Sequence, residues 1–317
     1  MILSIILLAV GLLLLIKGAD WLVNGASTIA RKKQISDLAI GLTIVAFGTS
    51  APELVVNVTA SIENHQDIVF GNIIGSNNFN LFFILGVAGL ITPLAVQSST
   101  LFKEIPVSFL AGILLLILAN SFIFQDEILS RTDGVILLIL FLAFLGYVYT
   151  QLKGVPVTKE VKEVDLPVWK IWGLIIIGLV ALIAGGKMVV NSAVFMATTM
   201  GVSEKLIGLT IIAAGTSLPE LATSVVAALK RNSDIAIGNV IGSNIFNIFF
   251  ILGVSATVRP IAYDIIFNRD IFLLLGGTAL LFLMLFFGKK KLGRLPAALL
   301  VATFIIYTLY LVSQEIY

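Results

Sequence analysis

Two stretches of this chain occur twice, in the same order. The first reads GLTIVAFGTSAPELVV at residues 41–56 and GLTIIAAGTSLPELAT at residues 208–223. The second reads GNIIGSNNFNLFFILGV at residues 71–87 and GNVIGSNIFNIFFILGV at residues 238–254. Both pairs are offset by 167 positions (208 − 41 and 238 − 71), so the two halves align without a gap. The duplication predicts a fold made of two copies of one structural unit.

The duplicated stretches lie within long apolar segments, and these indicate the class of protein. Hydrophobic residues make up 59% of the chain and charged residues 12%, which is typical of polytopic membrane proteins. The chain has no cysteine, which excludes disulfides and thiolate metal sites. We expect an all-α membrane protein with ten transmembrane helices. These are expected at residues 2–30, 38–61, 68–92, 102–122, 127–151, 169–200, 204–229, 235–258, 266–288 and 294–314.

The ten spans divide into two five-helix repeats. The first repeat is expected at residues 1–151 and the second at residues 169–317, joined by the hydrophilic linker 152–168. The duplicated motifs fall within residues 38–92 and 204–258. Because each repeat has an odd number of helices, the second enters the membrane from the opposite side, and the repeats are expected to be inverted.

Basic residues predict which helix ends face the cytoplasm. Counting the spans alternately, one side receives fourteen of the twenty lysine and arginine residues. They are Arg31, Lys32, Lys33, Lys103, Lys153, Lys159, Lys162, Lys170, Lys230, Arg231, Lys289, Lys290, Lys291 and Arg294. The positive-inside rule makes this side cytoplasmic, together with the linker, and places both termini outside the cell membrane. No basic region precedes the first apolar segment, so we interpret it as a membrane helix and not as a signal peptide.

Each repeat carries a glutamate in an apolar helix that a proline interrupts. A charge near the centre of a bilayer costs roughly 3 kcal/mol on insertion scales, so Glu53 and Glu220 need a compensating partner. No Lys or Arg lies near the same depth in these helices, and we therefore expect a cation. The proline removes one backbone hydrogen bond and blocks another, which frees carbonyl oxygens. Hydroxyl groups that precede the glutamates add further oxygens: Thr49, Ser50, Thr216 and Ser217.

The second duplicated motif adds polar groups along one helical face. Its polar residues recur at every fourth position, which aligns them on one side of an α-helix. They are Asn72, Ser76 and Asn80 in the first repeat and Asn239, Ser243 and Asn247 in the second. The four segments offer hydroxyl, amide, carbonyl and carboxylate oxygens, with no His or Cys among them. Such hard ligands suit Na⁺ and Ca²⁺, and not zinc or copper.

The paired GTSxPE and GNxIGSNxFN segments resemble the two alpha repeats of the calcium/cation antiporter superfamily. They are most similar to those of its Na⁺/Ca²⁺ exchanger family, in a prokaryotic form, and the resemblance covers both halves of the chain. It implies ten transmembrane helices in two inverted repeats, with the second, third, seventh and eighth helices around the ions. It also implies that the first and sixth helices slide across this core to alternate access.

The resemblance assigns ligands by position. It implies a central Ca²⁺ site made of the Glu53 and Glu220 carboxylates and the Thr49 and Thr216 carbonyls. It implies flanking Na⁺ sites made of the Ala46 carbonyl, Ser50 and Ser76, and of the Ala213 carbonyl, Ser217 and Ser243. Asn80 and Asn247 would complete the middle of the cluster.

We therefore expect a secondary antiporter that expels Ca²⁺ in exchange for Na⁺, embedded in the lipid bilayer and functional as a monomer. No enzyme activity, cofactor or nucleic-acid partner is expected. With both glutamates ionised and unoccupied, two charges would be sealed into a low-dielectric core, so the empty carrier should reorient slowly. Three Na⁺ per Ca²⁺, the stoichiometry that the resemblance implies, would make the exchange electrogenic.

Three alternatives remain at this level. A Ca²⁺/H⁺ antiporter would protonate the same glutamates, although such relatives typically show GNxxE in place of GNxIGS. The chain also departs from some K⁺-dependent relatives, which carry Asp at the position of Asn247, whereas this chain has an amide there. An intramembrane hydrolase lacks a base, because the only histidine, His65, lies in a predicted loop. A channel is a third possibility, but inverted repeats with broken helices point to alternating access.

Overall fold

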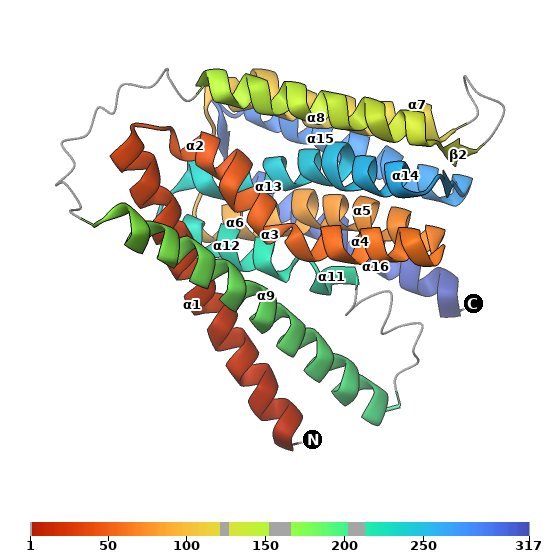
Figure 1. Cartoon of the computed structure of the whole chain (residues 1–317), viewed down its shortest axis with the longest axis horizontal. Helices are drawn as coiled ribbons and strands as arrows, with labels where there is room; N and C mark the ends of the chain where they lie inside the picture. The colour runs from red at the N-terminus through yellow and green to blue at the C-terminus, as the bar shows by residue number, and fades with distance from the viewer. Residues whose placement is uncertain (1, 121–126, 152–165, 202–212, 317) are drawn as a thin grey trace.

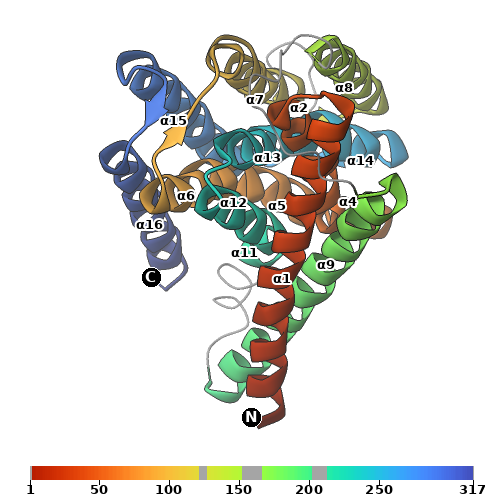
Figure 2. The same cartoon turned by 90° about the vertical axis from the view of Figure 1, so that its left-hand side faces the viewer.

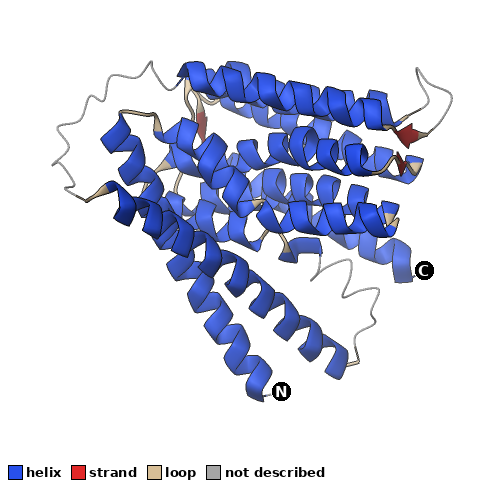
Figure 3. Cartoon of the chain, viewed as in Figure 1, coloured by secondary structure: helices blue, strands red, loops and turns tan. Residues whose placement is uncertain are grey.

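The structure, a computed structural model, describes residues 2–120, 127–151, 166–201 and 213–316, and it is nearly all helical (Figures 1 and 3). In the first half the helical elements are α1 (Ile2–Lys33), α2 (Asp37–Ile40), η1 (Gly41–Val45), α3 (Ala46–Thr49), α4 (Ala51–Glu63), α5 (Gln66–Asn78), η2 (Phe79–Ile84), α6 (Leu85–Ile91), η3 (Thr100–Glu104), α7 (Ile105–Ala119) and α8 (Arg131–Gln151). In the second half they are α9 (Val168–Thr199), α11 (Ala213–Gly215), α12 (Leu218–Leu229), α13 (Ser233–Ile245), η5 (Phe246–Leu252), α14 (Gly253–Val258), η6 (Ile265–Phe267), α15 (Asn268–Phe287) and α16 (Arg294–Ile316).

The described helices agree with most of the predicted spans. Eight of them are long and apolar enough to cross a membrane, and a bent pair makes a ninth when it is counted as one span. That pair is Asp37–Thr49 with Ala51–Glu63. The span expected at residues 204–229 lies partly outside the described residues, and its described part is α11 and the apolar helix α12.

Short strands at the helix ends are a departure from the all-α expectation. Four two-residue strands form two antiparallel ladders, in which β1 (Leu94–Ala95) pairs with β4 (Lys291–Leu292) and β2 (Ile128–Leu129) pairs with β3 (Ile261–Ala262). The ladder of β2 also moves the start of the fifth predicted span. That helix was expected from residue 127 and begins at Arg131 instead.

After the strand, a side-chain cap fixes the start of the helix. Ser130 precedes the helix, and its backbone N–H and hydroxyl both donate to Asp133 Oδ2, at 2.8 and 2.6 Å. A serine with an acidic side chain three residues later satisfies backbone donors at a helix start. Asp133 is buried in this cap.

The helix that carries Glu53 is broken, as its proline predicts. Its two segments meet at Ser50 with a bend of 48°. Pro52 lies in the first turn of α4, where a missing N–H costs no helical hydrogen bond. In the second repeat Ser217 precedes α12 in the same way, with Pro219 in its first turn. The proline therefore starts a new helix in each repeat, and each glutamate lies in the first turn.

The helices that follow contain π-helical turns at matching positions. α5 passes into η2 after Asn78, and α13 passes into η5 after Ile245. Such turns widen a helix locally and occur frequently at functional sites. Asn80 and Asn247 lie at the second position of each π segment.

The central helices are enclosed by the others. Both cartoon views place α5 and α13 in the interior, with α7, α8 and α15 on one side and α1 and α9 on the other (Figures 1 and 2). α13 packs closely against α2 and η1: a Cβ added to Gly238 would lie 3.0 Å from the Leu38 carbonyl oxygen in α2 and 3.0 Å from the Leu42 backbone nitrogen in η1. The two proline-broken helices therefore meet the two helices that continue into η2 and η5 at the centre of the bundle.

α1 and α9 form an antiparallel pair whose glycines contact one another. A Cβ added to Gly18 would lie 2.8 Å from the Gly178 carbonyl oxygen, and one added to Gly185 would lie 2.7 Å from the Gly11 carbonyl oxygen. Gly178 and Gly185 are the positions 167 residues after Gly11 and Gly18 (178 − 11 and 185 − 18). The contacts are thus exchanged between the repeats, as a pseudo-two-fold axis between the two helices would require.

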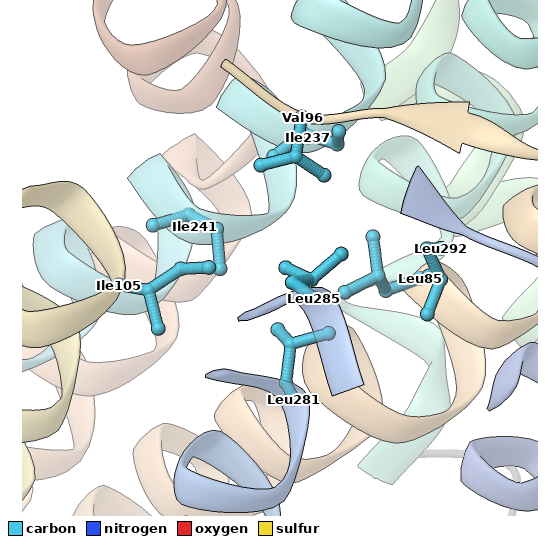
Figure 4. A pocket seen from close by; sticks show the side chains of 8 residues that line it. All are labelled: Leu85, Val96, Ile105, Ile237, Ile241, Leu281, Leu285 and Leu292. Carbon is cyan, nitrogen blue, oxygen red and sulfur yellow. The ribbon is translucent and has the colours of Figure 1, made fainter. Parts of the chain in front are cut away.

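An apolar cluster fills the space between the central helices and the outer ones. Figure 4 shows its side chains pointing toward one another, around a cavity of about 10 Å³. They are Leu85, Val96, Ile105, Ile237, Ile241, Leu281, Leu285 and Leu292. A space of that size holds at most one water and offers it no polar partner, so the cluster is a packed seal and not an ion site.

Candidate cation site

The two glutamates occupy equivalent and fully buried positions. Glu53 and Glu220 are each 0% exposed, in the first turns of α4 and α12. The preceding serines have nearly the same backbone conformation, with φ −84° and ψ 10° at Ser50 and φ −89° and ψ 9° at Ser217. The partial positive charge of a helix N-terminus favours an anionic side chain at this position. Among the described residues, neither glutamate is paired with a basic side chain.

Each glutamate accepts a hydrogen bond from the serine of the other repeat. The Ser50 hydroxyl donates to Glu220 Oε1 at 2.7 Å, and the Ser217 hydroxyl donates to Glu53 Oε1 at 3.1 Å. These two bonds cross between residues that are far apart in the sequence. They bring both carboxylates into one cluster and occupy one oxygen of each.

The serines of the second motif join the same cluster. Ser50 is hydrogen-bonded to Ser243 at 3.0 Å, and Ser217 is hydrogen-bonded to Ser76 at 3.0 Å. All four hydroxyls are buried, at 0–2% exposure. The structure therefore brings together the four serines that the sequence singled out, in two pairs that each join one repeat to the other.

The threonine hydroxyls point to asparagines on the neighbouring helices. Thr49 Oγ1 donates to Asn239 Oδ1 at 3.0 Å, and Thr216 Oγ1 donates to Asn72 Oδ1 at 3.1 Å. Both asparagines belong to the face that the four-residue spacing predicted. Thr49 Oγ1 also lies 3.3 Å from the Ala46 carbonyl oxygen, which accepts the Ser50 N–H at 3.0 Å.

Four asparagines form a clamp between the helix of α5 and η2 and the helix of α13 and η5. Asn77 Nδ2 donates to the Asn244 carbonyl, and Asn244 Nδ2 donates to the Asn77 carbonyl, both at 3.3 Å. Their side-chain oxygens accept from the neighbouring asparagines, Asn80 Nδ2 to Asn244 Oδ1 at 3.1 Å and Asn247 Nδ2 to Asn77 Oδ1 at 2.9 Å. The amide nitrogens of Asn80 and Asn247 are thus occupied, and their oxygens are left for another partner.

Two glutamates and two asparagines of this cluster each have one acceptor oxygen that is buried without a donor among the described residues. These oxygens are Glu53 Oε2, Glu220 Oε2, Asn80 Oδ1 and Asn247 Oδ1. A buried acceptor without a partner costs about 1–3 kcal/mol, and a charged one costs more. They come in two equivalent pairs, so a single partner that reaches both repeats would account for all four. A cation bound among them would do so, and oxygen ligands of this kind suit Na⁺ and Ca²⁺.

The described residues offer no competing metal centre. No group of three or more His, Cys, Asp or Glu side chains gathers anywhere in the described part of the chain. The central cluster has only two carboxylates, and its remaining ligands would be neutral oxygens.

Sequence reasoning left two asparagines out of the site. Asn77 and Asn244 form the reciprocal bonds of the clamp, whereas the sequence assigns a ligand role only to Asn80 and Asn247. The signal was present, because Asn77 and Asn244 also follow one another by 167 positions. Asn57 was missed as well: its Nδ2 donates to the Glu53 carbonyl at 2.8 Å, and no duplicated motif marks it.

The two halves of the network differ at this point. Asn239 Nδ2 donates to the Glu220 carbonyl at 3.2 Å and to Ser224 Oγ at 2.9 Å. In the first repeat, Asn57 stands at the position of Ser224 (224 − 57 is 167). Asn57 donates directly to the Glu53 carbonyl, whereas in the second repeat Asn239 makes the equivalent bond to the Glu220 carbonyl. The site is therefore close to symmetric, but it is not identical in the two repeats.

Comparisons with known proteins agree with this geometry. The family model described as "Sodium/calcium exchanger protein" matches residues 3–150 and 170–313. The chain is 37% identical to the inner membrane protein YrbG of Escherichia coli, over 97% of this chain and 96% of that protein. It is 31% identical to the sodium/calcium exchanger MaX1 of Methanosarcina acetivorans, over 82% of this chain and 84% of that protein.

A solved structure matches the fold across the whole chain. A structure of the sodium-calcium exchanger NCX_Mj superimposes with a TM-score of 0.84 at 34% sequence identity, over 97% of this chain and 98% of that one. The family match covers both repeats, including all four segments that build the central cluster. The chain belongs to the sodium/calcium exchanger family of membrane proteins.

Proposed function

We propose that this protein is a secondary antiporter that exchanges Na⁺ for Ca²⁺ across the membrane by alternating access. The observation that carries this function is the set of four buried oxygens without a donor, on two glutamates and two asparagines of the central cluster. The family supports the identity of the ions, since MaX1 and NCX_Mj are both described as sodium/calcium exchangers. The family does not favour H⁺ as the coupling ion.

The ligand assignments follow from this function. The Ca²⁺ site would use the Glu53 and Glu220 carboxylates with the Thr49 and Thr216 carbonyls. The Na⁺ sites would use the Ala46 carbonyl with Ser50 and Ser76, and the Ala213 carbonyl with Ser217 and Ser243. Asn80 and Asn247 would contribute their unpartnered oxygens in the middle. The hydrogen bonds that join these serines across the repeats support a single shared cluster.

Charge balance makes the exchange obligatory. Two ionised glutamates buried without a cation would cost several kcal/mol each in a low-dielectric core. One Ca²⁺ neutralises the pair, and so do Na⁺ ions together with neutral oxygens. The loaded carrier can therefore change its access, whereas the empty carrier is held back. If three Na⁺ exchange for one Ca²⁺, each cycle moves one net charge.

The proposed architecture has ten transmembrane helices in two inverted repeats, 1–151 and 169–317, joined by a cytoplasmic linker at 152–168. Both termini would lie outside, and the monomer would be the functional unit. The glycine contacts exchanged between α1 and α9 support a two-fold relation between the repeats. The matching proline breaks and π turns support it too.

Calcium uptake into proteoliposomes tests the function. Vesicles loaded with Na⁺ should accumulate ⁴⁵Ca²⁺ from a Na⁺-free medium, and vesicles loaded with choline should not. A second arm replaces the Na⁺ gradient with a pH gradient of matched size. Uptake driven by the pH gradient alone would show a Ca²⁺/H⁺ antiporter, and uptake without any counter-gradient would show a channel.

A further inference from the structure

Lys230 joins the end of α12 to the α1/α9 pair. Its Nζ lies 2.6 Å from Asp20 Oδ1 in α1. The same Nζ donates to Asn24 Oδ1 at 2.6 Å and to the Asp20 carbonyl at 3.2 Å. Asn232 adds a second link by donating to Ser27 Oγ at 3.1 Å. None of these residues belongs to the central cluster.

Two of these positions carry reversed charges in the other repeat, and the third is asparagine in both. Advancing Asp20 and Asn24 by 167 residues gives Lys187 and Asn191 in α9 (187 − 20 and 191 − 24). Moving Lys230 back by 167 residues gives Glu63 at the end of α4 (230 − 63). An acid on α1 with a base on α12 is thus matched by a base on α9 with an acid on α4.

The ends of α4 and α12 have the same backbone geometry, which supports this correspondence. Asn64 and Arg231, the residues that follow Glu63 and Lys230, are both left-handed, at φ 66° and φ 57°. The next residue on each side donates its N–H to an equivalent carbonyl: His65 to Ala60 and Asn232 to Ala227, at 2.8 and 2.9 Å.

The second set of residues is not joined in this structure. Glu63 has a side chain that is 57% exposed and lies 3.7 Å from His65 Nε2. Lys187 is exposed, and within the described ranges it makes no ion pair. Figures 1 and 2 show the C-terminal part of α9 leaning away from the bundle, whereas α12 lies along α1. One pair is closed while its counterpart is open.

We propose that Asp20–Lys230 and Lys187–Glu63 are alternating latches, each of which holds the α1/α9 pair against the core in one access state. This inference rests on the proposed exchange function and on the inverted relation of the repeats. Because the repeats would be inverted, the latches lie on opposite sides of the membrane. The closed latch lies at the Lys230 end, on the side that the basic residues assign to the cytoplasm. Motion of one bundle against another about a fixed site breaks one latch and forms the other.

Cysteine pairs test this directly, because the chain has no cysteine of its own. Asp20→Cys with Lys230→Cys and Glu63→Cys with Lys187→Cys should each form a disulfide under mild oxidation during turnover. Either disulfide should stop ⁴⁵Ca²⁺ uptake in Na⁺-loaded vesicles, and a reductant should restore it. In the protein with all four cysteines, mass spectrometry should find one disulfide or the other in each molecule. Both disulfides in one molecule, or no disulfide between residues 63 and 187 while uptake continues, would overturn the proposal.

Charge-neutral variants give an independent readout with opposite signs. Asp20→Asn should favour the cytoplasm-open state and lower the Ca²⁺ concentration for half-maximal transport from that side by about two- to fivefold, the effect of one partly exposed ion pair. Glu63→Gln is the matched variant and should raise it. The swap Asp20→Lys with Lys230→Asp should return it toward wild type. Shifts in the same direction, or no rescue by the swap, would leave Asp20–Lys230 as a static ion pair.

The same vesicles separate failure of the latches from failure of the exchange function. If wild-type uptake requires Na⁺ but Asp20→Asn and Glu63→Gln shift the Ca²⁺ concentration for half-maximal transport in the same direction, the latches are overturned and the exchange function stands. Wild-type vesicles without Na⁺-driven uptake overturn the exchange function, and the disulfides still report whether the two pairs alternate.

Discussion

In both Glu53 and Glu220, one carboxylate oxygen accepts a hydrogen bond from a serine of the other repeat. The second oxygen of each has no donor among the described residues. Burial of an unpaired carboxylate is unfavourable in the absence of a cation. If these residues bind the ions, as we propose, they destabilise the empty site and stabilise the loaded one.

Removing either carboxylate should abolish Ca²⁺ transport. Glu53→Gln or Glu220→Gln leaves one negative charge for a divalent ion and replaces an oxygen ligand with an amide. The fold should persist, because no basic partner among the described residues is left unpaired. The measurement is ⁴⁵Ca²⁺ uptake by the variant, and its size-exclusion elution profile in detergent shows whether the fold persists. Glu104→Gln is the control, since Glu104 is equally buried but contacts Tyr147 outside the site. Near-normal exchange by either site variant would refute the assignment.

The serine hydroxyls should affect Na⁺ more than Ca²⁺. They are neutral ligands, and a doubly charged ion depends more on the carboxylates. Substitution by Ala should raise the Na⁺ concentration for half-maximal exchange more than the Ca²⁺ concentration at each of Ser50, Ser76, Ser217 and Ser243. Titration of each ion at a saturating level of the other measures this difference. Equal effects on the two ions would show that the hydroxyls only pack the helices together.

The clamp asparagines should act on affinity through their neighbours. Asn77→Ala removes the acceptor that holds Asn247 Nδ2, so the Asn247 oxygen loses its fixed orientation. The expected loss in apparent Ca²⁺ affinity is about five- to tenfold, the value of one buried hydrogen bond. Asn244→Ala should match it, because the clamp is reciprocal. Asn78→Ala is the control, as Asn78 is buried beside the clamp but donates to the Asp270 carbonyl. An equal loss in the control would assign the effect to packing.

At the scale of elements, the site depends on the close approach of α13 to η1. A Cβ at Gly238 would meet the Leu38 carbonyl and the Leu42 backbone nitrogen at 3.0 Å, and neither backbone atom can move aside easily. Gly238→Ala should therefore lower stability by about 1–3 kcal/mol, the usual range for overpacking. Gly146→Ala in α8 is the control, because a Cβ added at Gly146 would have no neighbouring atom within 4 Å. The midpoint of thermal unfolding in detergent compares the two. A Gly238→Ala protein as stable as wild type would refute this packing.

The elements themselves were largely predictable from the sequence, and the reasons differ from case to case. Apolar length predicted the spans, and Pro52 predicted the break in the helix of Glu53, because both effects are local. The clamp of Asn77 and Asn244 depends on side chains that are far apart in the sequence. The strand pairing of β2 with β3 is likewise a tertiary contact, so the sequence placed the start of α8 four residues too early.

At the scale of the whole molecule, one shared site would couple the transport of the two ions. The two buried charges must be neutralised before the carrier can change its access state, so the empty carrier should reorient slowly. Neither ion should therefore be transported without the other. The two latches act at the periphery of this motion and do not bind ions. Under this proposal, coupling is a property of the complete chain, because both repeats would contribute ligands.

Simultaneous measurement of ²²Na⁺ efflux and ⁴⁵Ca²⁺ uptake in the same proteoliposomes tests this claim most directly. With the membrane potential clamped, the two fluxes should rise together, keep a constant ratio as either ion is varied, and vanish when either ion is replaced by choline. Glu53→Gln should abolish both fluxes, because both ions depend on the same carboxylate. Calcium uptake that continues at an unchanged rate without Na⁺, or a flux ratio that drifts with concentration, would contradict exchange at a single shared site.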